Sequence, residues 1–151
     1  MKTIKYVKRE AYIKDPLLAH SDDYPDAGYD LSAAEGCIIE PGSRATIDLG
    51  ISFELPPATA KWKWEAQLRS RSGHRRNHGL VVHTATIDSG FRGFLSCVIF
   101  NHSTEPYSVE SGERICQILF VKLPNVKLKS IKSFKLKAKR GINGFGSTGK
   151  K

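Results

Sequence analysis

The residues best suited to chemistry lie in a short acidic turn, the segment TIDSGFRG at residues 86–93. It places one carboxylate, Asp88, before a glycine and follows it with an aromatic ring, Phe91, and with Arg92. This arrangement suits a hairpin that presents Asp88 to a site. Asp-Ser-Gly is also ordinary turn chemistry. The segment alone therefore leaves a catalytic turn and a plain structural turn open.

A second aspartate, Asp30, sits between apolar neighbours in the segment AGYDL at residues 27–31. Burying a carboxylate costs several kcal/mol unless it accepts hydrogen bonds or faces a cation. Asp30 is therefore expected to have such a partner. Gly28, two residues earlier, predicts that the backbone passes close to another group here.

A basic turn, RSRSGHRRNHG at residues 69–79, suits the binding of an anion. The guanidinium of Arg71, the hydroxyl of Ser72 and the backbone amides near Gly73 could together hold phosphate oxygens. A solvated basic loop is the alternative. His74 and His78 are four residues apart and could share a metal on a helix, but no third ligand with zinc-like spacing accompanies them.

The last twelve residues, 140–151, are rich in glycine. The glycine spacing approaches that of a phosphate-binding P-loop, but Lys151 stands where the motif needs Ser or Thr. Such a terminus is expected to be a flexible arm. Phe145, an aromatic residue among glycines and hydroxyls, could close over a flat base.

Short β-like runs must position these residues. Turn signals separate apolar or alternating runs at residues 3–8, 37–40, 44–55, 61–69, 79–83, 94–100, 114–121 and 126–138. The clearest alternation, at residues 61–69, predicts a half-buried strand with Trp62, Trp64, Ala66 and Leu68 on its inner face. The runs at 79–83 and 94–100 predict a hairpin that presents Asp88. Many short strands without helical periodicity favour an all-β fold, a sandwich or barrel.

Length and composition limit the class of protein. A chain of 151 residues suits one domain, expected at residues 1–139, with the arm at 140–151. No run of some 18 apolar residues and no signal-like start occur, so no membrane contact is expected. Three cysteines, odd in number and widely spaced, indicate buried thiols of an intracellular protein. The expected location is cytoplasmic, or nuclear in a eukaryotic or viral host.

The net charge of +9 is concentrated in one part of the chain. Residues 1–113 hold 13 basic against 15 acidic residues, a net of −2, whereas residues 114–151 hold 11 basic residues and no acid. This excess attracts polyanions, either nucleic acid or the phosphates of a nucleotide. A solvated lysine face explains it equally well, and no aromatic pattern typical of RNA recognition accompanies it.

Five stretches, taken together, resemble in order the five motifs of the homotrimeric deoxyuridine triphosphatases (dUTPases). They are AGYDL at 27–31, RSG at 71–73, IDSGFRG at 87–93, GERICQ at 112–117 and RGINGFGSTG at 140–149. Each motif alone is weak evidence, but five in this order, spanning residues 27–149, are specific.

The resemblance implies a distorted jelly-roll-like β-fold and a homotrimer with active sites shared between subunits. It also implies hydrolysis of dUTP to dUMP and pyrophosphate, which keeps uracil out of DNA and supplies dUMP for dTMP synthesis. By similarity, Asp88 is the catalytic base for water attack on the α-phosphorus. Asp30 would help to hold a hydrated Mg²⁺ ion through water.

The resemblance also implies two sets of binding residues. The phosphates would contact Arg71, Ser72, Gly73, Gln117, Arg140, Ser147 and Thr148. The nucleoside would contact His83, Thr84, Ala85, Ile87, Phe91, Phe145 and Gly146. Phe91 would lie against the deoxyribose and Phe145 over the uracil.

Several positions depart from the dUTPase pattern, and two alternatives compete with it. Phe91 replaces the usual tyrosine, Ala85 a glycine and Ser70 a proline. One alternative is a related dCTP deaminase, which needs a glutamate where this chain has Val98. The other is a binding module whose basic last quarter contacts nucleic acid or a protein.

Overall fold

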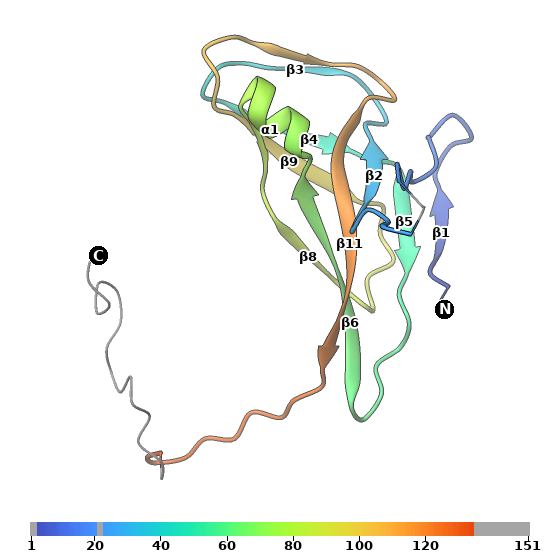
Figure 1. Ribbon diagram of the computed structural model, residues 1–151, viewed down its shortest axis with the longest axis vertical. Helices are drawn as coiled ribbons and strands as arrows, with labels where there is room; N and C mark the ends of the chain where they lie inside the picture. The colour runs from blue at the N-terminus through green and yellow to red at the C-terminus, as the bar shows by residue number, and fades with distance from the viewer. Residues whose placement is uncertain (1–2, 21–22, 135–151) are drawn as a thin grey trace.

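A computed structural model describes residues 3–20 and 23–134 and shows a nearly all-β fold (Figure 1). This confirms the expected fold class. The strands within these residues are β1 (Lys5–Lys8), β2 (Tyr29–Ser32), β3 (Cys37–Ile39), β4 (Arg44–Asp48), β5 (Ile51–Glu54), β6 (Trp62–Ser70), β7 (Leu80–Val82), β8 (Ala85–Asp88), β9 (Ser96–Asn101), β10 (Tyr107–Val109) and β11 (Arg114–Pro124). One short helix, α1 (Ser72–His78), follows β6.

Antiparallel pairing arranges the strands in two larger and two smaller sheets. The larger sheets have the orders β2-β11-β6-β8 and β4-β9-β7, and the smaller ones pair β1 with β5 and β3 with β10. The β3–β10 pair crosses one end of the larger sheets, beside α1 (Figure 1). Within the described residues these sheets do not join into a closed barrel. The predicted domain boundary at residue 139 lies outside the described ranges.

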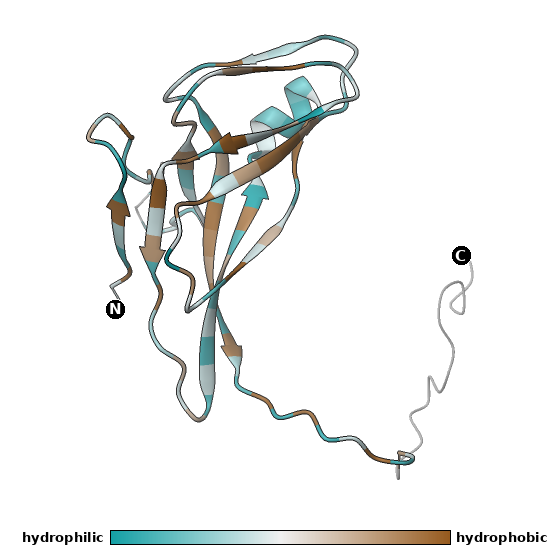
Figure 2. Cartoon of the chain, turned by 180° about the vertical axis from the view of Figure 1, so that it is seen from behind, coloured by the Kyte–Doolittle hydropathy of each residue, from teal (hydrophilic) through white to brown (hydrophobic). Residues whose placement is uncertain are grey.

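The core fills the space between the sheets. Its fully buried side chains come from nearly every strand and include Ile39, Ile51, Leu68, Ile99 and Ile118. Figure 2 shows the hydrophobic positions on the strands of the main body, whereas α1 is hydrophilic. Cys97 and Cys116 are buried as expected, but Cys37 is only partly buried. No helix in the described part of the chain is long and apolar enough to cross a membrane.

Strand β6 confirms the predicted alternation only in part. Ala66 and Leu68 are fully buried, but Trp62 is 43% exposed and Trp64 lies at the edge of the core. The expectation of a buried indole at Trp62 is wrong because β6 and β11 extend beyond the rest of the sheet, where Trp62 pairs with Pro124. There the ammonium of Lys122 lies 4.4 Å from the centre of the Trp62 ring, which supplies a cation–π contact instead of burial.

Two further segments differ from expectation. Residues 125–134 form no strand and run away from the sheets (Figure 1). Their apolar side chains, such as Leu128 and Phe134, are exposed because no neighbouring strand of the same chain lies beside them. The basic turn after β6 is the helix α1, which ends at Gly79 with a left-handed φ of 65°. A seven-residue helix is marginal by itself, so side-chain contacts must hold it.

The predicted Asp88 hairpin forms in a modified way. β7 and β9 pair as its two arms, with Val82 opposite Ile99. Between them β8 leaves this sheet and pairs with β6, with Asp88 opposite Glu65. The loop of the hairpin is therefore an edge strand of the other sheet, and Asp88 stands at the end of that strand.

Asn101, at the end of β9, ties the turn that follows β9 to strand β3. It is fully buried, and its amide nitrogen donates to the carbonyls of Ile39 and Glu105, each at 2.8 Å. Its amide oxygen accepts from the Ser103 backbone N–H and hydroxyl at 2.9 and 2.7 Å. All the hydrogen-bonding capacity of the side chain is used, which ties β9 to β3.

Replacing Asn101 by alanine is expected to destabilise the fold by roughly 2–4 kcal/mol, because buried carbonyls lose their donors. Urea unfolding followed by circular dichroism measures this loss. Asn125→Ala is the matched control, since Asn125 is exposed and its side chain donates one hydrogen bond, to Thr59. Equal stabilities of the two variants would contradict the assignment.

Candidate active site

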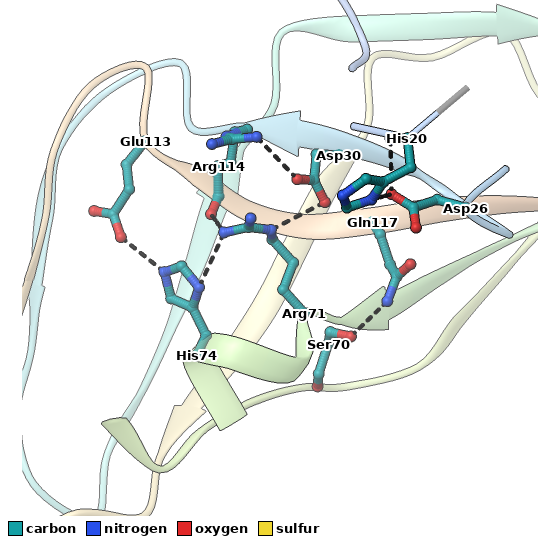
Figure 3. Close-up of polar contacts among 9 residues, drawn as sticks. All are labelled: His20, Asp26, Asp30, Ser70, Arg71, His74, Glu113, Arg114 and Gln117. Carbon is teal, nitrogen blue, oxygen red and sulfur yellow. Dashed lines mark hydrogen bonds and ion pairs between the residues drawn. The ribbon is translucent and has the colours of Figure 1, made fainter. Parts of the chain in front are cut away.

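Asp30 lies in a clamp formed by two arginines (Figure 3). Its side chain is 14% exposed, and its two oxygens face Arg71 Nε at 2.9 Å and Arg114 Nη1 at 3.4 Å. The expectation that Asp30 has a cationic partner is confirmed. β11 makes this possible because it lies between β2 and β6, with Gln117 opposite both Asp30 and Arg69.

Arg71 precedes α1 in an extended conformation that turns its side chain back toward β11. Besides its bond to Asp30, the guanidinium donates from Nη1 to the Arg114 carbonyl at 2.9 Å and lies 3.3 Å from His74 Nδ1. Three protein groups thus fix the orientation of this guanidinium (Figure 3).

A second polar cluster, made of His74, Glu113 and Tyr107, contacts Arg71 through His74. Glu113 Oε1 is 2.8 Å from His74 Nε2 and accepts from the Tyr107 hydroxyl at 2.7 Å. Burial alone would raise the pKa of Glu113, but the hydrogen bonds from His74 and Tyr107 outweigh burial and lower that pKa. Burial and the neighbouring Glu113 carboxylate raise the pKa of Tyr107 to about 12, so its hydroxyl remains a donor at neutral pH.

Gln117 confirms the prediction of close approach at Gly28. A Cβ atom on Gly28 would lie 2.8 Å from Gln117 Oε1, so a larger residue would displace this side chain. The amide nitrogen of Gln117 donates to the carbonyl of Ser70 at 2.9 Å. Gln117 of the fourth motif therefore contacts Gly28 of the first motif and Ser70, which directly precedes the second motif.

A cavity of about 650 Å³ opens beside this cluster. None of its lining residues is acidic, and three are arginines: Arg69, Arg75 and Arg76. Ser72, Thr84 and Gln117 also line it. Its basic lining suits an anion such as a phosphate chain, and its volume leaves room for one.

Asp88 stands at a separate cavity of about 250 Å³, which Ile87 and Phe91 also line. The predicted tight turn is present, since the Phe91 N–H donates to the Asp88 carbonyl at 3.0 Å. Arg92 closes the turn through the carbonyls of Ser89 and Phe91 at 2.7 and 2.8 Å. Asp88 is exposed, and no side chain among the described residues bonds to its carboxylate.

The Phe91 ring lies across the backbone at Gly93. A Cβ atom on Gly93 would come within 2.5 Å of the ring, so a side chain there would push the ring away. Phe91 is 47% exposed and lines the Asp88 cavity.

Asp88 lies beside the middle of β6, whereas the arginine clamp lies at the end of β6. Asp88 pairs with Glu65, whereas Ser70 directly precedes Arg71, and five residues of strand separate these positions by roughly 17 Å. One chain therefore holds two half-sites, one around Asp88 and one around Arg71.

The remaining predicted residues are placed as follows. His83 is exposed, with its ring centre 6.2 Å from that of Phe100, and Ala85 pairs with Leu68 at the start of β8. Gly73 is exposed in α1. The predicted arm residues Arg140, Phe145, Gly146, Ser147 and Thr148 lie outside the described residues.

Sequence reasoning missed the roles of His74, Tyr107, Glu113 and Arg114. It considered His74 only as a metal ligand beside His78. The two rings are 6.0 Å apart on α1, but no group of three or more potential ligands occurs among the described residues. The polar pair Glu113–Arg114 at the start of an apolar strand was the available signal.

Comparison with known proteins gives a consistent result. The sequence model of the dUTPase family matches residues 16–149. The deoxyuridine 5'-triphosphate nucleotidohydrolase of Clostridium tetani is 40% identical over 149 residues, covering 97% of this chain and 95% of that protein. The enzyme of the same name from Yarrowia lipolytica is 36% identical and covers 82% of this chain and 76% of its own.

Among solved structures, a dUTPase of Staphylococcus bacteriophage 80alpha with dUpNHpp superimposes with a TM-score of 0.87. It is 27% identical, and the match covers 99% of both chains. The motifs that converge at the arginine clamp and the turn at Asp88 lie within the matched residues. The chain belongs to the dUTPase family.

Proposed function

We propose that this chain hydrolyses dUTP to dUMP and pyrophosphate. The observation that carries the proposal is the exposed Asp88 carboxylate in a fixed turn, on a chain that also builds a cationic cavity beside the Arg71 clamp. The relatives named above are deoxyuridine 5'-triphosphate nucleotidohydrolases, and the phage enzyme was solved with dUpNHpp.

Asp88 acts as the general base. A water oxygen attacks the α-phosphorus while Asp88 accepts a proton from that water. The bond between the α-phosphorus and the oxygen that bridges to the β-phosphorus breaks, and pyrophosphate leaves with the bonding electrons. The carboxylate is suited to this role because no described side chain occupies its oxygens.

The phosphate chain is held by the other half-site. Arg71, Ser72, Gly73 and Gln117 bind the phosphates, and Arg140, Ser147 and Thr148 of the arm contact the terminal ones. Their positive charge and N–H groups stabilise charge that develops on the phosphate oxygens, which is the main source of catalysis in phosphoryl transfer.

The nucleoside lies along the Asp88 turn. The residues proposed to bind it are His83, Thr84, Ala85, Ile87, Phe91, Phe145 and Gly146. The exposed face of Phe91 packs on the deoxyribose, where a 2′-hydroxyl would collide with the ring. This contact selects deoxynucleotides over ribonucleotides.

The described residues fit a Mg²⁺ ion that arrives with the substrate. They contain no cluster of three or more ligand side chains, and both oxygens of Asp30 already face arginines. Asp30 would therefore reach the ion through water, and triphosphate oxygens would supply the direct ligands. When bound, the ion would neutralise phosphate charge.

The two half-sites meet between subunits of a homotrimer. Roughly 17 Å of strand separates the residue opposite Asp88 from the Arg71 end of β6, so the base and the phosphate-binding residues of one chain lie far apart along the sheet. A neighbouring copy supplies the missing half, so that each site combines Asp88 of one subunit with Arg71 of another.

The rival functions are less well supported. Val98, at the position where a dCTP deaminase needs a glutamate, lies in β9 and offers its backbone carbonyl to the His83 N–H. An apolar side chain cannot move a proton. A weak contact of nucleic acid or protein with the exposed lysines Lys127, Lys129 and Lys132 stays a prediction, compatible with enzyme activity.

The first prediction concerns the preferred nucleotide and the general base Asp88. With Mg²⁺, the protein should release pyrophosphate from dUTP and far less from dTTP, dCTP or UTP.

Asp88→Asn should lower turnover by roughly a hundredfold to ten-thousandfold, the range of general-base catalysis, and should retain nucleotide binding. Asp15→Asn, which changes an exposed carboxylate in the N-terminal segment, is the control. Full activity of Asp88→Asn, or ammonia release from dCTP, would refute the assignment.

The second prediction tests the shared site. Asp88→Asn and Arg71→Ala should each be inactive as homotrimers. Unfolding and refolding the two together should restore about a quarter of the wild-type activity, because random assembly gives about one site in four both intact halves. Each variant refolded alone is the control. An inactive mixture of correctly assembled trimers would show that each chain builds its own site.

The third prediction concerns the metal. Chelation with EDTA should abolish dUTP turnover but leave the melting temperature of the free protein unchanged, because the ion is held by substrate oxygens. Added Mg²⁺ should restore turnover. A large fall in melting temperature after chelation would instead reveal a structural metal site in the protein.

A further inference from the structure

The cluster behind Arg71 has no role in the reaction described so far. It consists of His74 on α1, Tyr107 on β10 and Glu113 in the turn before β11. We propose that His74 is a positioning residue, which holds the Arg71 guanidinium in the direction needed to bind the triphosphate. The proposal rests on the proposed function of the Arg71 half-site.

The contacts of His74 define which of its nitrogens carries hydrogen. An arginine can only donate, so Nδ1, 3.3 Å from Arg71 Nη1, must accept and carries no hydrogen. Nε2 then carries the hydrogen and donates to Glu113 Oε1 at 2.8 Å. The neutral His74 ring therefore links the Glu113 carboxylate to the Arg71 guanidinium. The hydrogen bond to Glu113 sets which ring nitrogen carries the hydrogen, as a partner residue does for many histidines in functional sites.

Glu113 is a rigid anchor for this histidine. Its Oε1 accepts from both His74 and Tyr107, and its Oε2 accepts from the Glu110 backbone N–H at 3.0 Å. The side chain of His74 is 12% exposed and that of Glu113 is 21% exposed, so water competes weakly for these bonds. The anchor belongs to the β10–β11 turn, away from the substrate cavity.

Arg71 divides its five N–H groups between the protein and the substrate. Nε–H bonds to Asp30, and the two N–H groups of Nη1 face the Arg114 carbonyl and His74. No acceptor among the described residues bonds to Nη2. Its two N–H groups are therefore left for phosphate oxygens, and their direction is set by the three protein acceptors.

The test compares two replacements of His74. His74→Leu keeps much of the volume but has no acceptor, whereas His74→Asn places an amide oxygen near the position of Nδ1. His74→Leu should lower kcat/KM for dUTP by about tenfold, the value of one hydrogen bond to a charged group. His74→Asn should recover most of this loss. His78→Leu, on the same helix and without a hydrogen bond to Arg71, is the matched control.

A double-mutant cycle separates positioning from simple support of the fold. If His74 acts through Arg71, His74→Leu should cost almost nothing further in an Arg71→Lys background. Additive losses, or equal activities of the Leu and Asn variants, would overturn the proposal. Melting temperatures of all variants identify any general loss of folding.

Pyrophosphate binding by calorimetry keeps this inference distinct from the proposed function. His74→Leu should weaken pyrophosphate binding by about tenfold, whichever nucleobase the enzyme prefers in its substrate. Absence of dUTP turnover in the wild type would refute the proposed function. Wild-type pyrophosphate affinity in His74→Leu would refute the positioning role of His74.

Discussion

The placement of the Asp30 carboxylate between two arginines is the constraint on which the site depends. A carboxylate that is 14% exposed would lose several kcal/mol of solvation, and Arg71 and Arg114 offset this cost. Asp30 lies in β2, Arg71 directly follows β6, and Arg114 begins β11. They can meet only because β11 lies between the other two strands. The site therefore requires this strand order in the sheet.

Features with a local cause could be predicted from the sequence. The cost of burial predicted a partner for Asp30, and Gly28 predicted close approach, which is to Gln117. Features set by distant contacts could not. α1 has no apolar face, and it is held by contacts such as that of His74 with Glu113, 39 positions away. Trp62 alternates like a core residue but extends beyond the sheet that would cover it.

The separation of the half-sites links assembly to chemistry. Under the proposed function, the exposed Asp88 and the arginine-lined cavity would have little hydrolytic power apart, because one would lack the bound phosphate and the other the general base. In the proposed homotrimer, a subunit interface would join them and would set their distance by the packing of rigid sheets rather than by a flexible loop. Such positioning is worth many kcal/mol in a phosphoryl transfer, since the reacting groups lose little further entropy.

The contacts of Arg71 also explain why an arginine is needed there. A planar guanidinium can bond to Asp30 through Nε, and to the Arg114 carbonyl and His74 through Nη1. It can still present its third nitrogen, Nη2, to the substrate. A lysine has three donors around one nitrogen, so satisfying the same protein acceptors would leave nothing for phosphate. In the proposed function, Arg71 therefore has two roles that usually need separate residues: it neutralises the largely buried Asp30 carboxylate and it binds the substrate. Its supporting residues matter because they decide how its donors are divided.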